Sequence, residues 1–179
     1  VFRCIQEGKS FRLEAGAGAG KTYSLIKALG FIIDKQGAEL LRQHQQVACI
    51  TFTNVAVNEI ESRTDGHPVI YASTIHSFCW TLIQAFQPLL REKLGEIDKW
   101  KTLLEEIDGI GVRSIRYDEN GHRRAKPDET YVSLHHDDVI SLTCCFFEYK
   151  KFQDLLTARF PILFIDEYQD TNCDFAEAL

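Results

Sequence analysis

The sequence feature that most constrains the fold is a string of small residues at 15–20, which Lys21 and Thr22 follow directly. Residues 10–15 alternate apolar and polar side chains, as a β-strand does, and from Lys21 onward apolar residues recur at helical spacing. A turn of small residues between a strand and a helix lets backbone N–H groups wrap the phosphates of a nucleotide. The predicted phosphate-binding loop consists of Ala15, Gly16, Ala17, Gly18, Ala19 and Gly20.

The two residues after this loop supply a charge and a metal ligand. Lys21 is expected to reach the β- and γ-phosphates of ATP, and the Thr22 hydroxyl is expected to coordinate Mg²⁺. Ala15 stands where a glycine usually opens such a loop. The alternative is a flexible glycine linker that precedes a lysine by chance, and the strand and helix patterns on either side disfavour it.

A second motif places two acidic residues after an apolar run. Residues 161–165 predict a buried strand, and Asp166 and Glu167 follow it. In open α/β sheets, ligands bind at the carboxyl edge of the strands. Asp166 is therefore expected to hold Mg²⁺, and Glu167 to orient and deprotonate an attacking water molecule. The alternative is an ordinary strand end whose acids face solvent.

The rest of the chain alternates strand and helix patterns around one insertion. Residues 47–52 and 69–72 predict strands, each followed by a helix with a capping residue, Asn54 in one case and Ser73 or Thr74 in the other. The predicted fold class is α/β, a P-loop parallel sheet flanked by helices. The expected ATP-binding domain comprises residues 1–85 and 158–179.

The predicted insertion, residues 86–157, is mainly helical and carries a β-hairpin. Helices are expected over 89–110 and 135–156, and short strands over 112–117 and 130–134. The Asn120-Gly121 pair between alternating segments is a strong turn signal, which places the hairpin there.

Four segments together resemble the N-terminal portion of superfamily 1 DNA helicases of the UvrD/Rep/PcrA or RecB/AddA type. The segment DEYQDTN (166–172) is similar to motif II of that family, and AGAGAGKT (15–22) is similar to motif I. ITFTNVAVNEI (50–60) resembles motif Ia, and STIHSFC (73–79) resembles motif Ib. The resemblance implies a RecA-like domain 1A, with the insertion as part of subdomain 1B.

The resemblance also implies roles for individual residues. Gln169 is expected to sense the γ-phosphate and link hydrolysis to movement. A track for single-stranded DNA is implied at Thr51, Phe52, Thr53 and Asn54, with Phe52 stacking on bases. Contacts with the DNA backbone are implied at Thr74, His76 and Ser77. The implied activity is ATP-driven translocation, 3′ to 5′, in DNA repair or recombination, with a second RecA-like domain and a nuclease domain or subunit as further partners.

Several of these residues have structural alternatives. Phe52 ends a predicted buried strand and would then be a core residue, and His76 would only buttress the start of a helix. The run 135–138, His-His-Asp-Asp, resembles a metal cluster, but a helix N-cap is the favoured interpretation. A group of basic residues would either grip duplex DNA or form a solvated face: Arg113, Arg116, His122, Arg123, Arg124 and Lys126.

The chain departs from the family pattern in two places. Gln6 lies too close to Lys21 to be the family's adenine-contacting glutamine. The sequence stops at Leu179, shortly after motif II, and contains no methionine, so a fragment is expected. Without the second domain and its arginine finger, such a fragment would bind ATP but hydrolyse it poorly.

Composition excludes several other classes of protein. The 45% of hydrophobic residues and 26% of charged residues are typical of a globular chain, and a net charge of −6 disfavours a basic nucleic-acid coat protein. The apolar stretch at 66–90 contains too many polar residues for a membrane span. Six cysteines without a pairing pattern predict buried thiols in a reducing compartment, and the expected location is the cytoplasm. Two other functions stay open, a small-molecule kinase and a nucleotide-gated binding module without motor activity.

Overall fold

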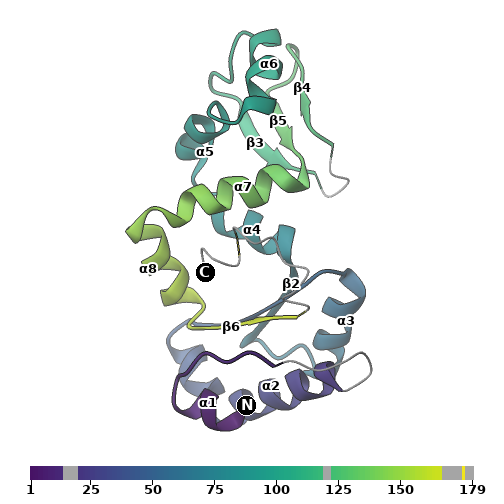
Figure 1. The fold of residues 1–179 in the computed structure, drawn as a ribbon, viewed down its shortest axis with the longest axis vertical. Coiled ribbons are helices and arrows are strands. Elements are labelled where there is room, and N and C mark those ends of the chain that lie inside the picture. Colours follow the sequence, from purple (N-terminus) through teal and green to yellow (C-terminus); the bar gives the residue numbers. More distant parts are fainter. Residues whose placement is uncertain (14–19, 119–121, 167–174, 176–179) are drawn as a thin grey trace. The chain divides into compact units, whose positions relative to one another are not determined.

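The computed structural model describes residues 1–13, 20–118, 122–166 and 175. The chain forms two compact units, residues 1–74 with 157–167 and residues 75–156 with 168–179 (Figure 1). Each unit has a sheet of its own. The domain limits expected from the sequence, 1–85 with 158–179 and 86–157, stay a prediction.

The sheet of the first unit is parallel and has the order β2-β1-β6. Its central strand is β1 (Val47–Thr51), which is buried throughout because it has neighbours on both edges. β2 (Ile70–Thr74) and β6 (Ile162–Ile165) flank it, and all three strands run in the same direction. The predicted α/β class with a parallel sheet is thus confirmed, and the carboxyl ends of the three strands lie at one edge.

Among its described residues, the first unit wholly contains three helices: α1 (Phe2–Gln6), α2 (Lys21–Arg42) and α3 (Asn54–Arg63). α2 begins at Lys21, as its apolar spacing predicted. The core consists of buried residues from α2, α3, β1 and the loop before β2: Leu29, Ile32, Leu40, Val47, Cys49, Ile60 and Val69. In the part of the chain that the structure describes, no helix is both long enough and apolar enough to cross a bilayer.

The strand predicted over residues 10–15 is wrong for its described part. Residues 10–13 belong to no strand, and 14–15 lie outside the described residues. All four described residues are exposed, so their alternation does not correspond to one buried and one solvated face. The segment nevertheless passes beside β6, because the ring of Phe11 lies 6.4 Å from that of Phe164.

The second unit contains four helices and a small mixed sheet among its described residues. Its sheet has the order β3-β5-β4, from β3 (Ser114–Tyr117), β4 (Arg124–Ala125) and β5 (Tyr131–Leu134). The helices are α4 (Ile75–Ile83), α5 (Gln87–Leu94), α6 (Asp98–Glu106) and α7 (His136–Phe147), and α4 packs against α7. α8 (Lys150–Arg159) begins in this unit and ends in the first.

Each long helix predicted in the insertion is two shorter helices. Gly95 ends α5, so residues 89–110 divide between α5 and α6. Residues 135–156 divide between α7 and α8, where the chain turns so that Phe152 packs against Phe146 and Phe147. Apolar spacing alone did not reveal these breaks, because buried apolar residues continue on both sides of each break, Leu94 and Trp100 in one case and Phe147 and Phe152 in the other.

The predicted hairpin connects different strands from those expected. Residues 119–121, including the Asn120-Gly121 pair, lie outside the described residues. β3 pairs with β5 in parallel, and β5 lies between β3 and β4, so the described β3 and β4 form no hairpin. The hairpin that the structure shows is formed by β4 and β5, which pair antiparallel. Its turn lies at Pro127 and Asp128.

Candidate functional site

The carboxyl edge of the parallel sheet brings together residues from three strands. Thr51 at the end of β1 pairs with Thr74 at the end of β2. Asp166 follows β6, and its backbone N–H donates a hydrogen bond of 2.9 Å to the carbonyl oxygen of Ile50. Asp166 therefore lies beside the end of β1, at the edge where ligands bind in open α/β sheets.

The N-terminus of α2 lies at this same edge. Residues 43–46 connect the end of α2 to the start of β1, so the helix runs antiparallel to the strands (Figure 1). Gly20 is its N-cap with φ +80°, a left-handed conformation that favours glycine. Among the described residues, no side chain caps the helix, and its first turn carries no acidic residue. Its N–H groups and positive dipole end thus fit an anionic phosphate.

The described residues of the predicted nucleotide site are Gly20, Lys21, Thr22 and Asp166. Lys21 and Thr22 are half-buried in the first turn of α2. Seven further predicted residues lie outside the described part of the chain: Ala15, Gly16, Ala17, Gly18, Ala19, Glu167 and Gln169. The closure of the loop around phosphates, and the position of the proposed base, stay predictions.

The turn after β1 presents an aromatic residue to solvent. Thr51 is only 1% exposed, and its hydroxyl donates a hydrogen bond of 3.1 Å to the carbonyl oxygen of Thr53. This contact stabilises the turn in which Phe52 is 38% exposed. The core alternative for Phe52 is therefore disfavoured, and the aromatic side chain is accessible to a base.

The cap of α3 is not the residue expected from the sequence. The helix begins at Asn54, but the hydroxyl oxygen of Thr53 accepts a hydrogen bond of 3.2 Å from the backbone N–H of Ala56. Thr53 has the extended backbone of an N-cap, φ −131° and ψ 146°. Asn54 is thus the first helical residue, and its exposed side chain has no capping role.

Replacing Thr53 with alanine is expected to destabilise α3 by about 1 kcal/mol, because the N–H of Ala56 loses its acceptor. Amide hydrogen exchange over residues 54–63 measures this loss directly. Asn54→Ala is the matched control and should leave the exchange of the helix nearly unchanged. Equal effects of the two substitutions would contradict the assignment of Thr53 as the cap.

The predicted DNA-backbone residues divide between the two units. Thr74 ends β2 in the first unit, whereas His76 and Ser77 lie in the first turn of α4 in the second. His76 is half-buried, and the centroid of its ring lies 4.6 Å from that of His136 in α7. Burial, followed by the charge of His136, lowers the pKa of His76 below its usual 6.5. The side chain is therefore neutral at pH 7, with one N–H donor and one acceptor nitrogen.

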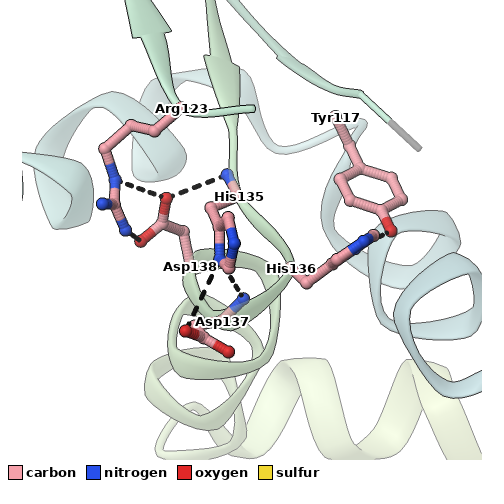
Figure 2. Close-up of polar contacts among 6 residues, drawn as sticks. All are labelled: Tyr117, Arg123, His135, His136, Asp137 and Asp138. Atoms are coloured by element: carbon pink, nitrogen blue, oxygen red, sulfur yellow. Dashed lines mark hydrogen bonds and ion pairs between the residues drawn. The ribbon is translucent and has the colours of Figure 1, made fainter. Parts of the chain in front are cut away.

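The His-His-Asp-Asp run at 135–138 is a helix cap, as the sequence favoured. His135 is the N-cap of α7, and its Nδ1 accepts a hydrogen bond of 3.2 Å from the N–H of Asp137. In return, the backbone N–H of His135 donates to Oδ2 of Asp138 over 3.0 Å (Figure 2). Among the described residues, no group of three or more histidine, cysteine, aspartate or glutamate side chains is arranged to hold a metal ion.

Most of the predicted basic cluster is engaged within the protein. Arg113 donates to the carbonyl oxygens of Gly109, Pro127 and Glu129. The other arginines contact Asp138 (Arg123), the carboxylate of Glu129 (Arg124) and the ring of Tyr131 (Arg116). These contacts favour a structural role for the arginines over a grip on duplex DNA.

The prediction of buried thiols holds for Cys49 and Cys79 and is wrong for Cys4, Cys144 and Cys145, which are half-buried. Burial raises the pKa of Cys79 to about 12. The pKa of Cys49 is also raised, first by burial and then by the charge of Asp166. Both side chains are therefore protonated near neutral pH and unreactive.

Comparison with known proteins identifies a family. A family profile described as "AAA domain" matches residues 3–179. The chain is 40% identical over 114 residues to Gabija protein GajB of Bacillus cereus (strain HuB5-5). This alignment covers 61% of this chain and 17% of the relative. The chain is 31% identical over 218 residues to ATP-dependent DNA helicase UvrD1 of Mycobacterium tuberculosis (strain ATCC 25618 / H37Rv), covering 94% of this chain and 28% of the relative.

A third relative gives a similar alignment. The chain is 26% identical over 207 residues to ATP-dependent DNA helicase PcrA of Staphylococcus aureus (strain NCTC 8325 / PS 47), covering 88% of this chain and 27% of the relative. The chain thus spans between 17% and 28% of the length of these relatives.

Proposed function

Because this chain belongs to the AAA domain family and has UvrD-like DNA helicases among its relatives, we propose that it is the ATP-binding and ATP-hydrolysing part of a helicase that translocates on single-stranded DNA. One structural observation carries the proposal. The uncapped N-terminus of α2, with Lys21 and Thr22, lies at the edge of the sheet where Asp166 follows β6. A positively polarised helix end and a carboxylate at the same sheet edge suit a triphosphate with its metal ion.

The described residues fit ATP and Mg²⁺. The N–H groups of the first turn of α2 would bind phosphate oxygens, and Lys21 would pair with the β- and γ-phosphates. Thr22 and Asp166 would hold Mg²⁺, which would neutralise part of the phosphate charge. Glu167 is proposed to accept a proton from the attacking water, and Gln169 to sense the γ-phosphate.

The proposed track for single-stranded DNA follows the turn after β1. Phe52 would stack on a base, and Thr53 and Asn54 would contact the strand beside it, while Thr51 holds the turn. Thr74 at the end of β2, and separately His76 and Ser77 of α4, would contact the DNA backbone. Neutral hydroxyl and imidazole groups suit such contacts in a chain whose net charge is −6.

The experiment that tests the proposal measures ATP hydrolysis by the complete protein with and without single-stranded DNA. Stimulation by DNA is expected, and unwinding of duplexes with a 3′ tail but not a 5′ tail would show the proposed polarity. If DNA does not change the rate of ATP turnover and the phosphate is transferred to a small molecule, the protein would instead be a kinase. Tight ATP binding without turnover would indicate a nucleotide-gated module, and either result would contradict the helicase.

Phe52→Ala should weaken binding of oligothymidylate by roughly 5- to 150-fold, because stacking on one base contributes about 1–3 kcal/mol. Fluorescence anisotropy with a labelled oligonucleotide measures the change. Leu155→Ala removes another exposed apolar side chain, in α8, and should leave the affinity unaltered. If both variants bind DNA like the unmodified protein, Phe52 does not lie on the track.

The cellular setting is proposed from the relatives. A second RecA-like domain and a nuclease domain or subunit are the proposed protein partners, because the relatives extend far beyond the aligned segment. DNA repair or recombination is the proposed process. The cytoplasm is the proposed compartment, consistent with the buried thiols of Cys49 and Cys79.

A further inference from the structure

A cluster of aromatic and imidazole side chains connects α4 to β3 and α7 within the second unit. The hydroxyl of Tyr117 in β3 lies 2.5 Å from Nδ1 of His136, the first residue of α7 (Figure 2). The ring of His136 lies 4.6 Å, centroid to centroid, from that of His76 in α4. Tyr117 also contacts α4 directly, because its ring lies 6.2 Å from that of Trp80.

Two independent anchors fix the imidazole of His136. The capping box formed by His135 and Asp138 holds the backbone at the start of α7. The hydrogen bond with Tyr117 then fixes the direction of the ring. Tyr117 is itself held in the sheet, where it pairs in register with Leu134 of β5. The ring that packs against His76 is therefore positioned by the small sheet and by α7.

Orientation matters for a neutral imidazole more than for a charged group. His76 is half-buried, and its lowered pKa keeps it neutral at pH 7. A neutral ring has one N–H donor and one acceptor nitrogen, so a rotation of the ring exchanges what it offers to a ligand. A lysine ammonium group at this position would bind a phosphate equally well after a rotation, because a point charge has little directional preference.

We propose that Tyr117 and His136 are positioning residues, which hold the ring of His76 in the orientation that hydrogen-bonds the DNA backbone. The small sheet and α7 thereby set the strength with which α4 binds single-stranded DNA. This inference rests on the proposed function, since it requires that α4 contacts DNA.

The first test is Tyr117→Phe in the complete protein, which removes the hydroxyl and keeps the ring beside Trp80. Affinity for labelled oligothymidylate should fall roughly three- to tenfold, the size of one neutral hydrogen bond. The KM for ATP without DNA should not change. Tyr149→Phe is the matched control, because Tyr149 is an exposed tyrosine of the same unit, and it should bind DNA normally.

A double-mutant cycle separates positioning from a general loss of structure. In a His76→Gln background, Tyr117→Phe should cause no further loss of DNA affinity, because the residue through which Tyr117 acts is already gone. If the fold-losses of DNA affinity caused by the two single substitutions instead multiply in the double variant, the inference is wrong. Thermal unfolding of all four proteins confirms that the cycle compares folded states.

The titration of His76 gives a readout independent of DNA. Among the described residues, the charged groups that shift its pKa are three residues at the start of α7: His135, His136 and Asp137. Tyr117 of β3 is hydrogen-bonded to His136. The charge of His136 lowers the pKa of His76, so His136→Gln should move the NMR titration midpoint of its imidazole upward. An unmoved midpoint would show that the two rings do not interact as proposed.

The outcomes distinguish the inference from the proposed function. If the complete protein does not bind single-stranded DNA, both fail. If it binds DNA and His76→Gln weakens binding, but Tyr117→Phe and His136→Gln do not, then only the positioning by Tyr117 and His136 is wrong.

Discussion

Replacing Lys21 with alanine is expected to reduce ATP turnover by the complete protein by about 10²- to 10³-fold, the typical effect of removing one preorganised donor from developing negative charge. Lys21 lies in the first turn of α2, at the edge of the sheet where Asp166 follows β6. Its ammonium group is expected to stabilise charge on the phosphates as the bond to the γ-phosphate breaks. Steady-state phosphate release in saturating single-stranded DNA measures the effect.

The next lysine of the same helix provides the matched control. Lys27 is exposed, and its Nζ lies 5.5 Å from the centroid of the Tyr23 ring. Lys27→Ala removes the same charge from α2 without touching the proposed phosphate site, so turnover should stay within about twofold of the unmodified protein. Glu167→Gln should retain ATP binding, measured with a fluorescent nucleotide, and lose turnover. Full turnover after Lys21→Ala would refute the proposed nucleotide site.

The parts of the fold that could be predicted from the sequence are those whose pattern reflects burial. β1 is a short apolar run because it is the central strand, and α2 shows helical spacing because one side packs on the sheet core. The resemblance to UvrD-like helicases was also predictable, since four motifs kept their order along the chain. The strand predicted from residue 10 is wrong for residues 10–13, because their apolar and polar side chains are all exposed to solvent.

The missed features of the candidate sites depend on contacts that no local pattern encodes. Thr53 and Asn54 are both good capping residues, and only the backbone conformation decides that Thr53 is the cap. The contact of His76 with His136 joins residues far apart in the chain. By contrast, the helix N-cap at 135–138 could be predicted from the sequence, because the residues of a cap lie close together in the chain.

Asp138→Ala is expected to lower the free energy of unfolding of the second unit by about 3 kcal/mol. One oxygen of the Asp138 carboxylate accepts from Arg123 Nη2 over 2.5 Å, and the other accepts from Arg123 Nε and from the backbone N–H of His135, each over 3.0 Å (Figure 2). Its side chain is 3% exposed and that of Arg123 is 22% exposed. Removing the carboxylate leaves a largely buried guanidinium without its partner and α7 without half of its capping box.

The adjacent aspartate makes this prediction specific. Asp137 is 69% exposed, and its contact with His135 is longer, at 3.5 Å, so Asp137→Ala should change the free energy of unfolding by less than about 0.5 kcal/mol.

Both tryptophans of the chain, Trp80 and Trp100, lie in the second unit, so urea unfolding followed by tryptophan fluorescence reports on that unit. Trp100 is fully buried, and the guanidinium of Arg123 lies 5.8 Å from its ring. If the two variants unfold at the same urea concentration, the buried pair does not stabilise the start of α7, and His136 loses one of the two anchors that hold it against His76.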